Sequence, residues 1–178
     1  MTEVERHVDV EVPLTTAYNQ YTQFEEFPRF MSGVERVTQL DDRRLHWVIE
    51  IGGLRREFDA EIIEQEPDQR ISWRSIDAKT HAGLVTFVAL DDIRTRVTVR
   101  MAYDPSGFAE NAADALGIIS ARLNGDLERF KTFIESNGRE TGAWRGEIGA
   151  GRTMPSRAGA RRGSGEKKAT SPRKRALR

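Results

Sequence analysis

The order of patterns along the chain constrains its fold more than any single motif does. Residues 4–12 alternate valine with polar residues, which predicts a strand with one buried face. Two short helical segments follow, at 14–23 and 24–31, and Pro28 limits the length of the second. A series of alternating segments and one long amphipathic helix complete this order.

Six further strands are predicted after the short helices, because apolar and polar residues alternate between turn signals such as Asp41-Asp42 and Gly52-Gly53. Strands joined by turns this short pair antiparallel. The predicted strands span 34–40, 44–51, 54–63, 69–76, 84–90 and 94–103.

The long helix is predicted from an apolar stripe spaced by three or four residues, which continues for about seven turns. Asn137-Gly138 is a typical helix end. Gly117 and Gly125 lie inside the helix, where a small residue allows either close packing or room for a ligand. The stripe consists of Phe108, Ala112, Leu116, Ile119, Leu123, Leu127, Phe130 and Ile134.

These elements predict an α+β fold in which a curved antiparallel sheet of six to seven strands lies against one long helix. A helix is about 10–12 Å wide, too narrow to fill such a sheet alone. The space left over is either an apolar cavity or is filled by large side chains. Those large enough to fill it are Trp47, Phe58, Trp73, Phe87, Met101 and Tyr103.

Charge divides the chain into an acidic body and a basic end. Of 28 basic and 28 acidic residues, ten basic ones and a single acid, Glu166, lie in 151–178. That segment carries +9 and the remainder −9. We expect a domain at 1–138, a short extension at 139–151 anchored by Trp144, and a disordered basic tail at 152–178.

Compartment and cofactor are constrained mainly by what the composition lacks. There are no cysteines, and no apolar run approaches the ~20 residues of a membrane span. The first residues show no secretion signal. A soluble, cytoplasmic protein is therefore expected, with no metal site and no cofactor, because three scattered histidines are poor metal ligands.

The segment YNQYTQFEEFPRFMSGVERV, followed by LHWVIEIGGLRREFDAEI and a G-x-V-T-F strand, resembles the START and birch-pollen-allergen (SRPBCC) superfamily, in its polyketide cyclase/dehydrase-like branch. The resemblance covers about residues 3–138. It implies the helix-grip fold, a deep hydrophobic pocket, and functions from lipid and polyketide binding to cyclisation of polyketide chains. It does not choose among these functions.

The leading hypothesis is binding of a small hydrophobic molecule, of a lipid, polyketide or quinone kind, between sheet and long helix. Strand parity, the helix stripe and the three phenylalanines of the second short helix, expected near the mouth of the pocket, supply the candidate pocket residues. They are Phe24, Phe27, Phe30, Trp47, Ile49, Arg56, Phe58, Trp73, Phe87, Met101, Tyr103, Leu116, Ile119 and Leu123.

The alternative is a polyketide cyclase or dehydratase, which needs an inward acid/base group. His81 shares parity with Val85 and Phe87 and is the candidate general base, although a solvated histidine at a strand start is also ordinary. Arg56 could fix a carboxylate or phenolate, or extend from a hairpin end into water. No complete catalytic set is recognisable.

A further alternative concerns the tail, which either binds a polyanion such as nucleic acid or an acidic surface, or only keeps the protein in solution. Its basic residues could neutralise phosphates without reading sequence. The candidates are Arg161, Arg162, Lys167, Lys168, Arg173, Lys174 and Arg175.

Overall fold

The computed structural model describes residues 2–76, 81–104, 112–149 and 152–154, with backbone alone for 112 and 152–154. The main sheet is antiparallel throughout, in the order β1-β7-β6-β5-β4-β3-β2. Its strands are β1 (Thr2–Val10), β2 (Val34–Gln39), β3 (Arg44–Ile51), β4 (Leu54–Glu66), β5 (Arg70–Ser75), β6 (His81–Asp91) and β7 (Arg94–Tyr103).

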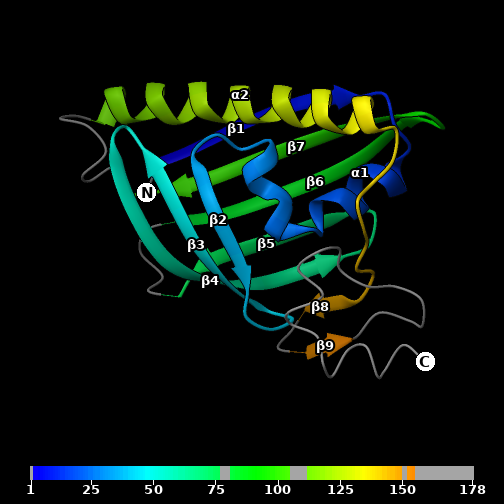
Figure 1. The fold of residues 1–178 in the computed structure, drawn as a ribbon, viewed down its shortest axis with the longest axis horizontal. Coiled ribbons are helices and arrows are strands. Elements are labelled where there is room, and N and C mark those ends of the chain that lie inside the picture. Colours follow the sequence, from blue (N-terminus) through cyan, green and yellow to red (C-terminus); the bar gives the residue numbers. More distant parts are fainter. Residues whose placement is uncertain (1, 77–80, 105–111, 150–151, 155–178) are drawn as a thin grey trace.

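The two predicted short helices lie between the first two strands, as α1 (Leu14–Tyr21) and the 3₁₀ helix η1 (Phe24–Arg29). Pro13 precedes α1 with φ −61°, the angle that its ring imposes anyway. The long helix α2 (Ala112–Asn137) lies across the open side of the curled sheet (Figure 1). The predicted helix-grip fold class is confirmed.

Hydrogen bonds hold α2 at two places that are far apart in the sequence. Along β1, the Lys131 ammonium donates to the carbonyl of Asp9 at 3.0 Å, and the Glu11 amide donates to Glu135 at 2.8 Å. Across the opening, the amide of Ser32 donates to the Asp126 carboxylate at 3.1 Å. The helix therefore bridges the first strand and the loop before β2, which closes the curl.

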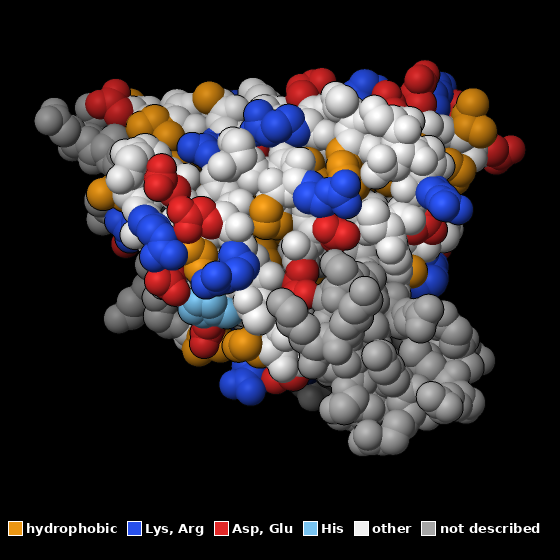
Figure 2. Space-filling model, viewed as in Figure 1, with side chains coloured by type: hydrophobic (Ala, Val, Ile, Leu, Met, Phe, Trp, Pro, Cys, Tyr) orange, Lys and Arg blue, Asp and Glu red, His pale blue; other side chains and the backbone are white. Residues whose placement is uncertain are grey.

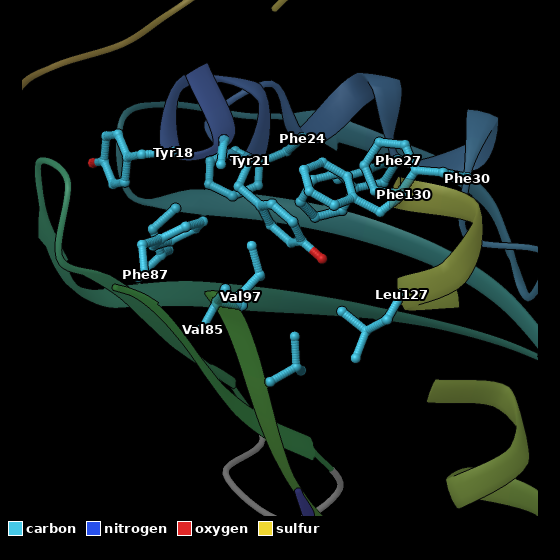
Figure 3. Close-up of a cluster of buried hydrophobic side chains, with 14 of the residues drawn as sticks. Tyr18, Tyr21, Phe24, Phe27, Phe30, Val85, Phe87, Val97, Leu127 and Phe130 are labelled. Atoms are coloured by element: carbon cyan, nitrogen blue, oxygen red, sulfur yellow. The ribbon is translucent and has the colours of Figure 1, made fainter. Parts of the chain in front are cut away.

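One end of this enclosure is filled by aromatic rings from α1, η1, β6 and α2 (Figure 3). The ring centroid of Tyr21 lies 4.6 Å from that of Phe130, and those of Tyr18 and Phe87 are 5.4 Å apart, both pairs edge to face. Such aromatic pairs stabilise a fold by more than the burial of their apolar area alone would. The cluster comprises Tyr18, Tyr21, Phe24, Phe27, Phe30, Phe87 and Phe130.

The segment after α2 folds back beside this filled end. Trp144 is fully buried and its amide donates to the Thr22 hydroxyl at 3.0 Å, while Arg145 donates to both carboxylate oxygens of Asp68. Strand β8 (Glu147–Gly149) pairs with β4. Strand β9 (Arg152–Met154) then pairs with β8, so the tail expected from residue 152 does not begin before 155.

Strand boundaries agree with the sequence for some strands and differ for others. Strands β3 and β7 have the predicted limits, whereas β1 ends at Val10 and β6 begins at His81. Strand β4 continues to Glu66, because a bulge between Ile62 and Glu64 allows pairing with β5 to go on. The predicted helix start at Phe108 lies outside the described residues.

Candidate functional site

A cavity of about 120 Å³ lies between the inner face of the sheet and the middle of α2. On the face shown in Figure 2, charged side chains of both signs are interspersed with small apolar areas, whereas the side chains that line the cavity are mostly apolar. The lining residues are Tyr21, Phe27, Met31, Gly33, Val34, Trp47, Ile49, Ile51, Phe58, Trp73, His81, Val85, Val99, Met101, Ile119, Arg122, Leu123, Asp126 and Leu127.

The sheet side of the cavity is a row of flat rings, one from each of β3 to β6. Trp47 stacks with Phe58 at 6.1 Å between centroids and 3° between planes, and with Trp73 at 6.4 Å and 17°. Parallel rings lie along the wall instead of projecting into the space. Trp73 lies across Gly83, its partner on β6, where any Cβ would overlap the indole.

His81 forms the end of this row. Its ring lies 4.9 Å from that of Phe58 at 12°, and only 7% of the residue is exposed. The solvated alternative for His81 was wrong, because β6 begins three residues earlier than the sequence indicated and carries the imidazole onto the inner face. The structure thus brings a titratable group to the cavity, and its role there stays a prediction.

The α2 side of the cavity carries charge. Asp126 accepts hydrogen bonds through Oδ1 from the Ser32 amide and from Arg129, and Arg122 donates to the Ser32 hydroxyl at 3.2 Å. Burial raises the pKa of Asp126 even though Arg129 and Arg122 lower it. The Arg122 guanidinium lies over Gly33, where a side chain would displace it.

Tyr21 contributes a hydroxyl to the cavity from the filled end. Its ring belongs to the aromatic cluster, but Figure 3 shows the hydroxyl pointing out of that cluster toward the side of Leu127 and Val85, both of which line the cavity. Tyr21 is 2% exposed. Burial, and to a smaller extent the charge of Asp126, raises the pKa of Tyr21 far above its usual value, so the hydroxyl keeps its proton.

Eight of the fourteen residues predicted for the pocket line this cavity. They come from η1, four strands and α2. They are Phe27, Trp47, Ile49, Phe58, Trp73, Met101, Ile119 and Leu123.

Arg56 and Leu116 are not in the lining. Arg56 has the inward parity that was predicted, but it sits near the β3–β4 hairpin end, where Leu54 of the same parity is 43% exposed. Leu116 is 40% exposed, because the first turns of α2 bury Ala115 and Ile119 instead. The apolar stripe predicted the helix correctly, but Leu116 does not lie on its buried face.

Four predicted aromatic residues are buried elsewhere. Phe24, Phe30 and Phe87 belong to the filled end. Tyr103 packs in a separate small core with Val4, Ala115 and Ile119, under the first turns of α2. Size and parity placed them inside correctly, but could not say which end of the enclosure they occupy.

Sequence reasoning missed eleven lining residues, or ten if His81, named only as a base, is set aside. Val85, Val99 and Leu127 follow inward patterns and could have been found by parity. Tyr21, Gly33, Arg122 and Asp126 carry no such signal, because a helix rim and a loop place them. Gly117 is exposed with open space around it, which excludes both explanations offered for that glycine.

Two other kinds of functional element are absent from the described residues. Within the described ranges, no three His, Cys, Asp or Glu side chains gather as a metal site, and no helix is long and apolar enough to cross a membrane. His46 bonds Asp59 and Glu57 on the outer face of the sheet, at 2.7 and 3.1 Å. The predicted polyanion-binding residues lie outside the described residues.

Comparison with known proteins agrees with this geometry. Residues 10–132 match the family model described as polyketide cyclase / dehydrase and lipid transport. The chain belongs to this family. It is 50% identical, over 149 residues, to a 17.2 kDa protein of the melC2–rnhH intergenic region of Streptomyces lincolnensis, across 83% of this chain and 99% of that one.

Solved structures share the family's fold. A START superfamily protein from Mycobacterium smegmatis matches with a TM-score of 0.68 at 14% identity, over 76% of this chain and 98% of that one. The ZhuI aromatase/cyclase from Streptomyces sp. R1128 matches with a TM-score of 0.63 at 15% identity, over 80% and 98%. A protein from Deinococcus radiodurans matches with a TM-score of 0.60 at 29% identity, over 77% of this chain and 99% of that one.

Proposed function

We propose that the protein binds a small hydrophobic molecule in the cavity between the sheet and α2. The observation that carries this proposal is the cavity itself, a space between sheet and helix that is lined mainly by apolar side chains. The family description, which includes lipid transport, supports the same function. The four-ring wall and the leucines of α2 offer such a molecule apolar contacts on two sides.

The cavity also limits the size of what binds without rearrangement. Drug-sized ligands occupy pockets of roughly 300–1,000 Å³, and an engineered apolar cavity of about 150 Å³ holds benzene. A space of about 120 Å³ is therefore on the scale of one ring. A longer lipid or a fused-ring polyketide would have to extend beyond this space.

Two measurements test the proposal. Native mass spectrometry of the protein purified from its own cell should show a bound small molecule. Backbone-amide NMR shifts on titration with benzene should change at Val85, Val99 and Leu127 and stay constant at Trp144. A protein that carries nothing and shows no shift at these cavity positions would contradict the proposal.

Catalysis is the second candidate, because titratable groups line an otherwise apolar space. His81 and Asp126 come from opposite walls, and the family description includes cyclase and dehydrase activity. Such groups can transfer protons to or from a bound polyketide. We expect His81→Ala to reduce turnover of a model poly-β-ketone and Arg56→Ala to leave it unchanged. Equal turnover in both variants would argue against this role for His81.

The basic end of the chain supports a separate hypothesis of polyanion binding. Its +9 charge would give weak, salt-sensitive retention on heparin. Because β9 reaches residue 154, the variant to compare with the full chain lacks only 155–178. Identical retention of the two proteins at low salt would exclude this function for the tail.

A further inference from the structure

Tyr21 and Trp47, which both line the cavity, carry uncharged hydrogen-bond donors, and the Trp47 indole nitrogen is buried without a partner among the described residues. Tyr21 is 98% buried, and Figure 3 shows its hydroxyl pointing out of the aromatic cluster toward the side of Leu127, which also lines the cavity. A donor that faces apolar side chains gains from any acceptor that reaches it. A ligand oxygen would provide such an acceptor.

The charged groups at the α2 rim are already bonded to one another. Asp126 accepts from Ser32 and Arg129, and Arg122 donates to the Ser32 hydroxyl. They hold the loop before β2 against the helix. The proton of Tyr21 is retained because burial and the nearby Asp126 charge both oppose its loss, so this group acts as a donor.

The walls indicate the shape of the remainder of the ligand. Trp47, Phe58 and Trp73 present flat rings from neighbouring strands, and Phe27 adds another from η1. Aromatic pairs gain energy beyond the area they bury. The volume of about 120 Å³ has room for one ring.

We infer that the ligand is a single-ring aromatic molecule whose oxygen substituent, a hydroxyl or a carbonyl, accepts a hydrogen bond from Tyr21. This inference rests on the proposed function and specifies the ligand class for that same cavity. It assigns Tyr21 as the residue that distinguishes an oxygenated ring from a plain hydrocarbon.

The experiment compares 4-fluorophenol and 4-fluorotoluene by ¹⁹F NMR titration against the wild-type chain, Tyr21→Phe and Tyr18→Phe. Tyr18 is the matched control, since it lies on the same helix, is fully buried and does not line the cavity. We expect Tyr21→Phe to weaken 4-fluorophenol binding roughly threefold to tenfold, the value of one net hydrogen bond, and to leave 4-fluorotoluene unchanged. Tyr18→Phe should change neither.

The other outcomes separate the two proposals. If both probes bind and Tyr21→Phe affects them equally or not at all, the inference is wrong while hydrophobic binding stands. If neither probe binds the wild-type chain, binding in the cavity fails, and the inference with it. A two-ring probe, 6-fluoro-2-naphthol, should bind less tightly than 4-fluorophenol; tighter binding would overturn the one-ring limit.

Discussion

The two ends of the enclosure under α2 contain similar side chains in opposite arrangements. At the filled end, α1 and η1 lie between helix and sheet, and their rings meet edge to face with Phe87 and Phe130. At the hollow end no helix or strand among the described residues lies between them, and the rings of Trp47, Phe58 and Trp73 lie parallel along the wall. The presence of the short helices, more than the number of aromatic residues, decides where a cavity remains.

The filled end is also the end that the rest of the chain reinforces. Trp144 and Arg145 fasten the segment after α2 to α1 and to the β4–β5 turn. Toward the hollow end, α2 is held to the loop before β2 by hydrogen bonds from Ser32 to Asp126 and from Arg122 and Arg129 to Ser32. Stability and ligand space are thus divided between two regions, and variants can test that division.

The largest contrast is expected between Phe130→Ala and Met101→Ala. Phe130 is fully buried among rings, so its loss should cost about 3–5 kcal/mol of unfolding free energy. Met101 is half-buried beside an existing cavity, and its loss should cost about 1–2 kcal/mol. Urea denaturation measures both values. Equal costs would contradict the division into a filled and a hollow end.

A sharper test uses two valines on one face of β7. Val97→Phe adds volume to the filled end and should lower the free energy of unfolding by about 1–3 kcal/mol. Val99→Phe adds the same volume beside the cavity and should be near neutral, or stabilise by up to about 1 kcal/mol. The second variant should also lose benzene binding. If Val99→Phe destabilises as much as Val97→Phe, the cavity is not available space.

Gly83→Ala tests the aromatic wall. A methyl group at this position would overlap the Trp73 indole, so the ring must move into the cavity. We expect a loss of roughly 1–2 kcal/mol in thermal denaturation and a shift in tryptophan emission. Gly149→Ala is the control, because a Cβ there meets nothing within 4 Å. Unchanged emission in Gly83→Ala would show that Trp73 does not lie as described.

The smallest effect is expected behind the wall, on its outer face. Hydrogen bonds to Asp59, and then to Glu57, raise the pKa of His46 above 6.5. Because the pKa of His46 is higher in the folded protein, its protonation stabilises the fold fully at pH values below the unfolded-state pKa. That contribution is lost as the pH rises through the folded-state pKa. His46→Gln should therefore lower the free energy of unfolding more at pH 6 than at pH 9, and the difference should be under about 1 kcal/mol for this exposed group. A pH-independent cost would contradict the ion pairing.

Turn signals and alternation were sufficient to predict β3 and β7 to the residue, and the spacing of the stripe was sufficient to predict α2. These features are local, because side-chain period and turn chemistry act over a few residues. The same local patterns identified Trp47, Phe58 and Trp73 as inward. They could not separate Phe87, which fills one end, from Met101, which borders the space.

What the sequence alone determined is the seven strands of the main sheet, the antiparallel pairing of strands joined by short turns, and the need for one helix to cover one curved sheet. Tertiary structure alone decided which end of that enclosure is filled, that Tyr21 turns its hydroxyl toward the other end, and that Asp126 meets Ser32 from 94 positions away. The reason is physical. A cavity is the volume that distant side chains fail to occupy together, and no local pattern records such a sum.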